Sequence, residues 1–395
     1  MSTSEILGVG LIGAGGIMHR HALAYLRFPD RVRLVAVSDI DPARAQAARN
    51  SFRMQAAYED YRDLLARDDV HVVSVCTRPD THAAAVLDAI DAGKHVLVEK
   101  PLARSLAEAD DIIAACDRNP ELRVSCLYQW RFDRAVQFAS RSVEQDRLGR
   151  PLLADVHLRA SPAPAYYDAG ARRESWGLDG GGVLIVYAIH QLDLLISLLG
   201  NPVEVSGQMD TFVRPTEGED TLTAWIRFES GALATLSCTA CAHEGRFSIE
   251  LVGEEASLRL SWERPASTCR WDVHASRGTK RRELAALGRR EAPRPRLEPG
   301  RYTRRALEIL HRVRGRPWLP PRHWWHTPYV SQYLDAIESG AEVPVPPREA
   351  RRSLELVAAI YQSALTGSPV RLPLDAGSPV YRGVEAREIQ MARGA

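Results

Sequence analysis

Residues 6–18 read ILGVGLIGAGGIM, and this stretch decides the first half of the fold. The apolar run ILGVGLI is typical of a buried strand, and the glycine cluster GAGGIM follows it directly. A helical pattern, HRHALAYLRF, begins at residue 19. A strand, a glycine-rich turn and a helix in this order predict a dinucleotide-binding loop, because glycines let the backbone approach a pyrophosphate at the helix N-terminus.

The loop glycines are Gly13 and Gly15, and Met18 replaces the third glycine of the usual G-x-G-x-x-G pattern. Gly8 and Gly10 also match the spacing with Gly13, but they lie inside the expected strand and cannot form the turn. The expected cofactor contacts in and after this loop are Gly13, Gly15, Gly16, Ile17 and Met18.

Asp39 ends the second apolar run, VRLVAVSD, 26 residues beyond Gly13. A carboxylate there can bind both ribose hydroxyls of the adenosine half and would repel a 2′-phosphate, so the sequence predicts NAD rather than NADP. Ile40 belongs to the same set of expected cofactor contacts. Asp41 is the better candidate for a helix N-cap, and nearby Arg44 leaves NADP open as the less favoured cofactor.

Five short apolar runs alternate with helical patterns over the first 130 residues or so. Such alternation is typical of a parallel, doubly wound sheet. The runs cover 6–12, 32–39, 70–77, 95–101 and 122–131, and the helical patterns cover 19–28, 41–52, 81–93 and 105–118.

The pattern then changes to long segments that alternate apolar and polar residues, which predict a largely antiparallel second sheet. These segments are 151–161, 202–213, 220–230, 231–242 and 246–262, accompanied by helical patterns at 180–199 and 347–367. We expect an α/β protein with a dinucleotide-binding domain at 1–126. A second α/β domain at 127–395 would serve substrate binding and oligomerisation.

The composition is that of an ordinary soluble protein. The chain has 395 residues, a net charge of +1 and 45% hydrophobic residues, which argues against binding to nucleic acid or a membrane. The N-terminus lacks a basic n-region, includes Glu5, and no apolar run is long enough to span a bilayer. We expect a cytoplasmic protein, and the six scattered cysteines suit a reducing compartment.

The segment CTACAH brings Cys238, Cys241 and His243 close in sequence and has the look of a zinc-ligand set. Its context alternates like a strand, and strand positions three apart point to opposite faces. One ion could not easily collect both sulfurs, so we expect no metal.

Basic residues are used unevenly. Lys94, Lys100 and Lys280 are the 3 lysines among 51 Lys and Arg residues, so a retained lysine suggests that its chemistry is needed.

Residues 277–322 hold 15 Lys and Arg against 4 Asp and Glu. This indicates a solvated basic insertion near 265–322, with a subunit contact or a site for a phosphorylated substrate as the alternative.

Three motifs resemble those of one known family. AGKHVLVEKPL at 92–102, GGGVLIVYAIHQLDLLISLLG at 180–200 and AIYQSALTGSPVRLPL at 359–374 are similar to motifs of the Gfo/Idh/MocA oxidoreductases, relatives of glucose-fructose oxidoreductase and inositol dehydrogenase. The resemblance implies a Rossmann domain with a doubly wound parallel sheet, joined to an α/β domain with a large open, mostly antiparallel sheet. It also implies an NAD(P)-dependent dehydrogenase or reductase, and we expect a homodimer or homotetramer.

The EKP motif of the family maps onto Glu99, Lys100 and Pro101. The resemblance places Lys100 near the nicotinamide, where its amine can hydrogen-bond a substrate hydroxyl and stabilise a developing alkoxide. A cis peptide bond before Pro101 is often found in the family, although it is the unusual isomer. The expected cofactor contacts from this half of the chain are Thr77, His82, Glu99, Lys100 and Gln129.

The helical pattern at 180–199 is apolar nearly all round, which predicts burial, yet His190, Asp193 and Ser197 fall on one face. A buried polar face needs partners or a cavity, and a substrate site lined by this helix meets that need. His190 is the natural general base, and Asp193 can orient it. The family pattern D-x-x-x-H is altered here, because Val186 stands in place of the aspartate and Ala188 in place of a glycine.

Aromatic and arginine side chains in LYQWRF and AYYDAGARRESWGLD could stack on and bind a polyol. The expected substrate contacts are Lys100, Trp130, Arg131, Tyr167, Trp176, His190 and Asp193.

These features predict an NAD-dependent oxidoreductase with Lys100 and His190 as catalytic residues. It would transfer a hydride between nicotinamide and a secondary alcohol or ketone of a sugar, cyclitol or sugar-bearing compound. Two alternatives stay open. A related enzyme could cleave a glycosidic bond through transient oxidation, with no net NAD turnover. The loss of the aspartate at position 186 also permits a non-catalytic NAD-binding regulator.

Overall fold

The structure is a computed structural model, and it describes residues 6–167, 174–263, 269–275 and 325–384. The described residues form two compact units. The first comprises 6–102, 111–129 and 325–347, and the second comprises 103–110, 130–167, 174–263, 269–275 and 348–384. Each unit takes residues from both sides of residue 126, so a domain division at that residue stays a prediction. The strongly basic residues 277–322 lie outside the described residues.

The first unit is built on a parallel sheet in the order β3-β2-β1-β4-β5-β6. Its central strands are buried on both faces, which is why their sequences are continuous apolar runs. The predicted doubly wound sheet is confirmed. The structure adds one edge strand, β3, which was not predicted because its three residues do not form an apolar run. The strands are β1 (Leu7–Ile12), β2 (Val32–Ser38), β3 (Ala56–Tyr58), β4 (Val72–Val75), β5 (His95–Val98) and β6 (Val124–Cys126).

Helices connect these strands. The carboxylate of Asp41 caps α2 by accepting hydrogen bonds from the N–H groups of Ala43 and Arg44, as expected. The helix α10 packs against α1 and was not predicted, because Pro328 and the adjoining basic segment obscure its apolar pattern. The helices are α1 (Met18–Tyr25), α2 (Pro42–Phe52), α3 (Tyr61–Leu65), α4 (His82–Asp91), α5 (Leu106–Arg118) and α10 (His326–Ser339), with a 3₁₀ turn at Pro79–Thr81.

The second unit is built on a sheet in the order β13-β12-β11-β7-β10-β9-β8-β14. Its neighbouring strands are antiparallel except for β7 and β10, so the predicted mostly antiparallel sheet is confirmed. The strands are β7 (Pro151–Arg159), β8 (Pro202–Asp210), β9 (Thr221–Phe228), β10 (Leu233–Thr239), β11 (Arg246–Gly253), β12 (Ala256–Glu263), β13 (Cys269–Ala275) and β14 (Val370–Arg371).

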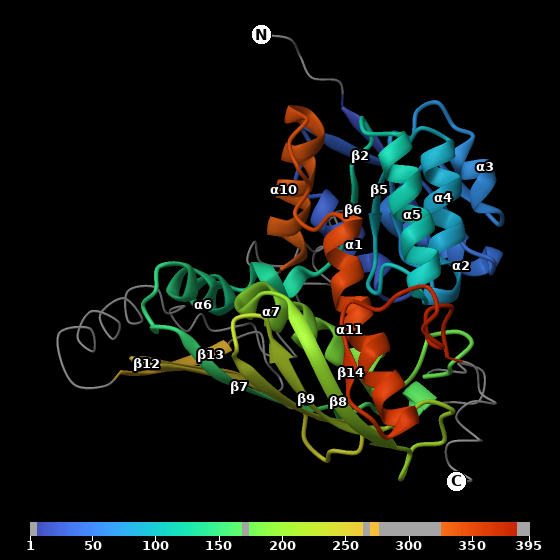
Figure 1. Cartoon of the computed structure of the whole chain (residues 1–395). Coiled ribbons are helices and arrows are strands. Elements are labelled where there is room, and N and C mark those ends of the chain that lie inside the picture. Colours follow the sequence, from blue (N-terminus) through green and yellow to red (C-terminus); the bar gives the residue numbers. More distant parts are fainter. Residues whose placement is uncertain (1–5, 168–173, 264–268, 276–324, 385–395) are drawn as a thin grey trace. The chain divides into compact units, whose positions relative to one another are not determined.

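Three helices pack on this sheet, and Figure 1 shows α11 (Pro347–Thr366) running along β8 and β14. Gly207 of β8 donates its N–H to the hydroxyl of Ser363 on α11 at 3.0 Å. The helices α6 (Arg134–Glu144) and α7 (Ile189–Leu199) pack on other strands, and α6 was not predicted. Further 3₁₀ turns lie at Gln129–Phe132 and Pro164–Tyr167.

The helix expected at 180–199 has a different form. Residues Leu184–Ala188 make a π-helical turn, and the regular helix α7 begins at Ile189. A π-turn widens the helix locally, and such turns are frequent at functional sites. Within the described residues, no helix combines the length and the apolar character that a membrane span requires.

Gly8 provides a test of the packing of β1. A Cβ there would lie 1.7 Å from the main-chain oxygen of Asp69, whereas a Cβ at Gly15 meets nothing within 4 Å. We expect Gly8→Ala to lower the free energy of unfolding by about 3 kcal/mol, the upper part of the usual range for overpacking. The control Gly15→Ala should change it by less than about 0.5 kcal/mol. Equal unfolding free energies in denaturant titrations would contradict this.

Candidate active-site residues

The glycine loop of the first unit packs against the ends of β2 and β4. Gly13 has a φ of 92°, and a Cβ there would lie 2.9 Å from the carbonyl group of Cys76 and 3.0 Å from the methyl group of Thr77. Glycine is therefore required for this turn. The N–H of Gly13 donates to the main-chain oxygen of Ser38 at 2.8 Å. The structure thus brings the predicted residues Gly13 and Thr77 together.

The segment after this turn leaves room for a ligand. Cβ atoms at Gly15 and Gly16 would meet nothing within 4 Å. α1 begins directly afterwards, with Ile17 as its N-cap residue and no acidic residue in its first turn. The N–H groups of a first turn have no intrahelical partner and attract anions. The side chain of Met18 is fully buried and anchors this helix start in the core.

Asp39 lies beside the same loop. Its Oδ2 accepts a hydrogen bond from the N–H of Ala14 at 2.7 Å, and its Oδ1 accepts one from the N–H of Asp41 at 2.9 Å. Ile40 is 90% exposed. The guanidinium of Arg44 pairs with Asp41 at 3.2 Å. These residues fit a dinucleotide, with the adenosine ribose at Asp39 and the pyrophosphate at the start of α1.

Lys100 stands in a turn at the carboxyl end of β5. The Lys100–Pro101 peptide bond is cis. Glu99 is buried, and its Oε2 accepts a hydrogen bond from the N–H of Lys100 at 3.2 Å. The Lys100 side chain is only partly buried, so its amine can reach a ligand while the backbone is held.

His82 holds the other side of this turn. Its ring is fully buried, with Nδ1 at 2.7 Å from the oxygen of Pro101 and Nε2 at 3.2 Å from the oxygen of Thr77. Burial lowers the pKa of His82, although both carbonyl groups act in the opposite direction. A neutral ring has one N–H, and the shorter contact assigns it to Pro101. Contacts of His82 and of the nearly buried Gln129 with a cofactor stay predictions.

In the second unit, a buried ion pair joins two of the predicted substrate residues. Arg131 donates to Asp193 through Nη2 at 2.6 Å and through Nε at 2.7 Å, and Ser353 donates to the same carboxylate at 3.1 Å. Another guanidinium nitrogen donates to Glu349 at 2.6 Å. Burial raises the pKa of Asp193, and the charge of Arg131 opposes that shift. That Asp193 orients His190 stays a prediction.

His190 lies one turn before Asp193 on α7 and is 8% exposed. Its ring lies 5.9 Å from the ring of Trp130, measured between centroids. The structure therefore brings His190 and Trp130 together, while their contact with a substrate stays a prediction. The predicted buried polar face is wrong at Ser197, which is exposed and donates to the main-chain oxygen of Leu194 at 2.8 Å. The helix reaches the surface there, near its C-terminal end.

The two other predicted substrate residues differ in their surroundings. The hydroxyl of Tyr167 donates to Glu174 at 3.2 Å, and burial raises the pKa of Glu174 to about 7. Trp176 is 3% exposed, donates its indole N–H to the oxygen of Glu217 at 2.9 Å and packs edge-on against Tyr361. This is the placement of a core residue, and a substrate contact of Trp176 stays a prediction.

Glu219 is a fully buried acid that no local sequence pattern indicates. Its carboxylate accepts hydrogen bonds from the N–H groups of Gly182 at 2.9 Å and Leu184 at 2.8 Å, and from the hydroxyl of Tyr361 at 2.9 Å. Burial raises the pKa of Glu219 to about 7, although these hydrogen bonds act in the opposite direction. Glu219 therefore fixes the start of the helix that carries His190.

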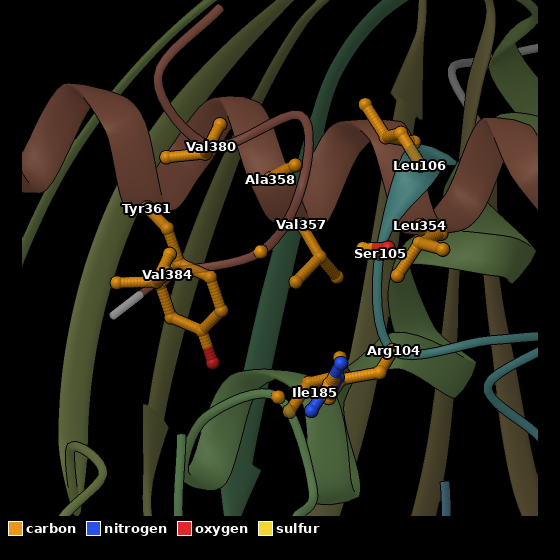
Figure 2. Close-up of a pocket in the computed structure, with 12 residues that line it drawn as sticks. Arg104, Ser105, Leu106, Ile185, Leu354, Val357, Ala358, Tyr361, Val380 and Val384 are labelled. Atoms are coloured by element: carbon orange, nitrogen blue, oxygen red, sulfur yellow. The ribbon is translucent and has the colours of Figure 1, made fainter. Parts of the chain in front are cut away.

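A small cavity lies in the second unit next to α11. Its volume is about 20 Å³, which is room for about one water molecule. Figure 2 shows Tyr361 and Val357 pointing toward it from α11, with Arg104 and Ile185 across from them. The cavity is too small for a sugar and is not the candidate substrate site.

Comparison with known families matches both halves of the chain. Residues 7–126 match the oxidoreductase family with an NAD-binding Rossmann fold, and residues 136–259 match the Gfo/Idh/MocA C-terminal domain. Together these matches cover more than half of the chain, so the protein belongs to the Gfo/Idh/MocA oxidoreductase family. The predictions of an oxidoreductase and of NAD as its cofactor are confirmed.

Individual relatives are dehydrogenases. D-apiose dehydrogenase of Paraburkholderia graminis is 25% identical over 386 residues, which cover 93% of this chain and 91% of the relative. Myo-inositol 2-dehydrogenase of Thermotoga maritima is 28% identical over 278 residues, which cover 69% of this chain and 80% of the relative. The solved WlbA dehydrogenase of Bordetella pertussis, in complex with NADH and UDP-GlcNAcA, has a TM-score of 0.77 and 26% identity, and the match covers 95% of this chain and 100% of that chain.

The position of Asp39 yields a prediction about cofactor choice. NAD should bind at least about tenfold more tightly than NADP, roughly 1.4 kcal/mol, because a carboxylate at this place is expected to bind both ribose hydroxyls and to repel a 2′-phosphate. Asp39→Ser should remove most of this difference. Arg44→Ala is the control and should not change it, since Asp41 already holds this guanidinium. Equal or tighter binding of NADP by the unmodified protein, measured by calorimetry, would contradict the assignment.

Proposed function

We propose that this protein is an NAD-dependent dehydrogenase or reductase for a secondary alcohol, or the matching ketone, of a sugar, cyclitol or sugar-bearing compound. One observation carries the proposal. Lys100, one of 3 lysines, lies in the turn after β5, and hydrogen bonds to Glu99 and His82 hold the backbone of this turn before and after it. The named activities of the relatives, on D-apiose and myo-inositol, support this substrate class. The UDP-GlcNAcA complex of the solved relative extends it to sugar nucleotides.

Each proposed catalytic residue handles one part of the alcohol. The Lys100 ammonium donates a hydrogen bond to the reacting oxygen and stabilises the negative charge that develops on it. A compact ammonium suits a single oxygen better than the planar fork of arginine. His190 removes the hydroxyl proton as general base. The nicotinamide, when bound, supplies the hydride acceptor, and in reduction the two side chains act in the reverse sense.

The proposal does not need an aspartate at position 186. A neutral imidazole is the form that accepts a proton, and a carboxylate neighbour favours the charged form instead. Val186 is only partly buried, so it offers an apolar contact one turn before His190. Trp130, against the His190 ring, and Tyr167 are the aromatic side chains that we propose for contact with a polyol. Arg131 and Asp193 complete the proposed substrate contacts.

The proposal includes a homodimer or homotetramer in the cytoplasm. Trp225 and Leu233 are 38% and 39% exposed. Trp225 pairs with Thr235, two residues from Leu233, so both project from the same face of the sheet. Exposed apolar groups on one sheet face support self-association there. Light scattering measures the oligomeric state.

A substrate screen tests the proposed activity. Polyols, sugars and sugar nucleotides are incubated with NAD while NADH absorbance is followed. We expect at least one secondary alcohol to yield NADH and an equal amount of ketone. Free sugar released from a glycoside without NADH would favour transient oxidation instead. Tight NAD binding with no turnover on any compound would favour the non-catalytic regulator and contradict the proposal.

Lys100→Met keeps the length of the side chain but removes its charge and its donors. We expect kcat to fall by about 10²–10³-fold, the usual cost of losing one oxyanion-type donor. NAD affinity measured by calorimetry serves as the control and should fall far less than kcat, because the loop at Gly13 and Asp39 is untouched. Near-normal turnover of this variant on the identified substrate would show that Lys100 is not catalytic.

His190 and Val186 give a paired prediction. His190→Ala should lower kcat by at least about 10²-fold, in line with general-base contributions. Val186→Asp should not raise activity on the native substrate, because that position is shaped for an apolar contact. The test measures kcat of both variants and of the unmodified protein by steady-state kinetics from pH 5 to 10. Unchanged turnover in His190→Ala would refute the base assignment, and a large gain in Val186→Asp would indicate that the native site has degraded.

A further inference from the structure

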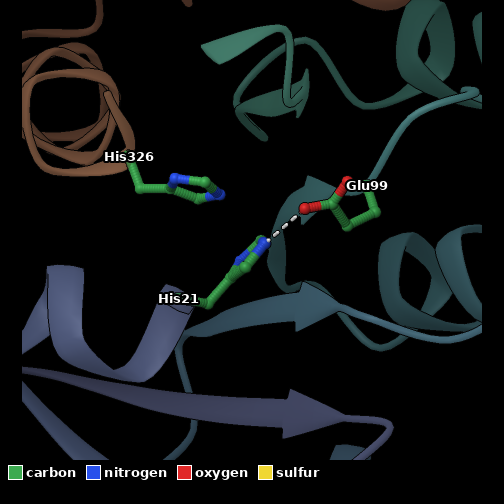
Figure 3. Close-up of side chains that lie close together, drawn as sticks. All are labelled: His21, Glu99 and His326. Carbon is green, nitrogen blue, oxygen red and sulfur yellow. Dashed lines mark hydrogen bonds and ion pairs between the residues drawn. The ribbon is translucent and has the colours of Figure 1, made fainter. Parts of the chain in front are cut away.

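Three buried ionisable side chains of the first unit converge next to the turn that carries Lys100. His21 of α1, Glu99 after β5 and His326 of α10 each offer one ligand-type atom, and these atoms lie within 4.8 Å of one another. Figure 3 shows the His21 and His326 rings directed toward the Glu99 carboxylate. The three residues are 0%, 6% and 4% exposed. Buried charges are costly unless they are paired, so this cluster requires an explanation.

Either a divalent cation or a proton could join these side chains. Two histidines and one glutamate form a ligand set that zinc accepts. However, the Lys100 ammonium acts electrostatically on Glu99, and the Arg20 guanidinium acts on His326. One carboxylate cannot balance a dication beside two further cations. The cluster therefore suits a proton held between His21 and Glu99 better than a metal ion.

The hydrogen bonds around His21 fit that description. Its Nε2 lies 3.0 Å from Oε1 of Glu99, its Nδ1 lies 3.3 Å from the hydroxyl of Ser74, and the hydroxyl of Tyr25 bonds the same Ser74 oxygen at 3.0 Å. Burial lowers the pKa of His21, but Cys76 and Glu99 outweigh it and the pKa is raised. Burial raises the pKa of Glu99, but His21 outweighs it and the pKa is lowered. The pair is a buried ion pair.

The second oxygen of Glu99 connects this pair to Lys100. Oε2 accepts the backbone N–H of Lys100 at 3.2 Å, while Oε1 faces His21. On the other side of the lysine, the His82 ring holds the oxygen of Pro101 at 2.7 Å. Two buried histidines thus restrain the main chain before and after the partly buried residue Lys100.

We propose that His21 is a positioning residue of the oxidoreductase: by holding the Glu99 carboxylate, it fixes the backbone of Lys100 so that the amine meets the reacting oxygen. This inference rests on the proposed role of Lys100. Reacting groups must be held in close register, and an error of about 1 Å from a distant mutation can cost about 10²-fold in rate. His21 therefore acts on the reaction through Glu99 and Lys100, without touching the substrate.

Kinetics of His21→Gln and Glu99→Gln test the proposal. Each amide variant keeps a hydrogen-bonding side chain but cannot form the ion pair, so kcat should fall about tenfold or more. His21 is not an expected cofactor contact, so NAD affinity in His21→Gln should stay within about twofold. The double variant should be no slower than the slower single variant, because all three lose the same interaction. Fully additive losses in kcat would overturn the proposal.

The pH profile separates positioning from a general loss of structure. In His21→Gln the buried Glu99 loses its cation and takes up a proton at a higher pH than before. The kcat of His21→Gln should therefore fall as the pH is lowered toward about pH 5. The unmodified protein and Glu99→Gln should not show this fall. Ser74→Ala keeps His21 but removes one of its hydrogen bonds, and it should lower kcat by about twofold to fivefold. If His21→Gln does not fold, unchanged kcat in both Glu99→Gln and Ser74→Ala still overturns the proposal.

Two controls complete the experiment. His326→Leu removes a buried ring whose Nε2 has no hydrogen-bond partner among the described residues, so kcat should stay within about twofold. Elemental analysis should find no bound metal, and about one zinc ion per chain would overturn the ion-pair assignment. Absence of turnover in the unmodified protein refutes the proposed function itself, whereas near-normal kcat in Lys100→Met refutes the catalytic role of Lys100 and with it the positioning role of His21. A strongly reduced kcat in Lys100→Met together with a normal kcat in His21→Gln refutes only the positioning role of His21.

Discussion

The parallel order of the strands is the constraint on which the cofactor half of the site depends. β1, β2, β4 and β5 all direct their carboxyl ends to one edge of the sheet, and the chain reverses its winding between β1 and β4. The residues that follow these strands each supply a different function there. Gly13 forms the turn, Asp39 supplies a carboxylate, Thr77 packs on the turn and Lys100 supplies an amine. Residues distant in sequence thus become neighbours because their strands are adjacent and parallel.

In the second unit, a buried ion pair holds together the segments that carry the candidate substrate residues. Arg131 and Asp193 join the 3₁₀ turn at Gln129–Phe132 to α7, at 2.6 and 2.7 Å. Breaking such a pair by removing one partner typically costs about 3–5 kcal/mol, because the remaining charge stays buried. Trp130 precedes Arg131, and His190 lies one turn before Asp193. The pair therefore joins the two segments that carry the Trp130 and His190 rings.

Features set by local spacing could be predicted from the sequence. Gly13 and Asp39 belong to one strand–helix–strand unit, so their spacing indicates both the fold and the cofactor. Features set by distant contacts could not. The pairing of His21 with Glu99 spans 78 residues, and the contact of Glu219 with Leu184 spans 35, with no local pattern to indicate either.

Several features that the sequence does not reveal have equally specific causes. The indole N–H and the ring of Trp176 are both used inside the core, so the structure adds no support for its substrate contact, which stays a prediction. Ser197 shares a helical face with Asp193, yet the helix reaches the surface before Gly200. The π-turn at Leu184–Ala188 begins where Glu219 accepts the N–H of Leu184, and sequence periodicity reveals neither feature.

Direct hydride transfer from the carbinol carbon to the cofactor is the central claim, and isotope transfer tests it most directly. The identified alcohol is deuterated at its reacting carbon and incubated with the protein and NAD, and the NADH formed is examined by proton NMR. The account predicts one deuterium at C4 of the nicotinamide for each ketone produced. NADH without deuterium, or consumption of the labelled alcohol with no labelled NADH, would contradict it.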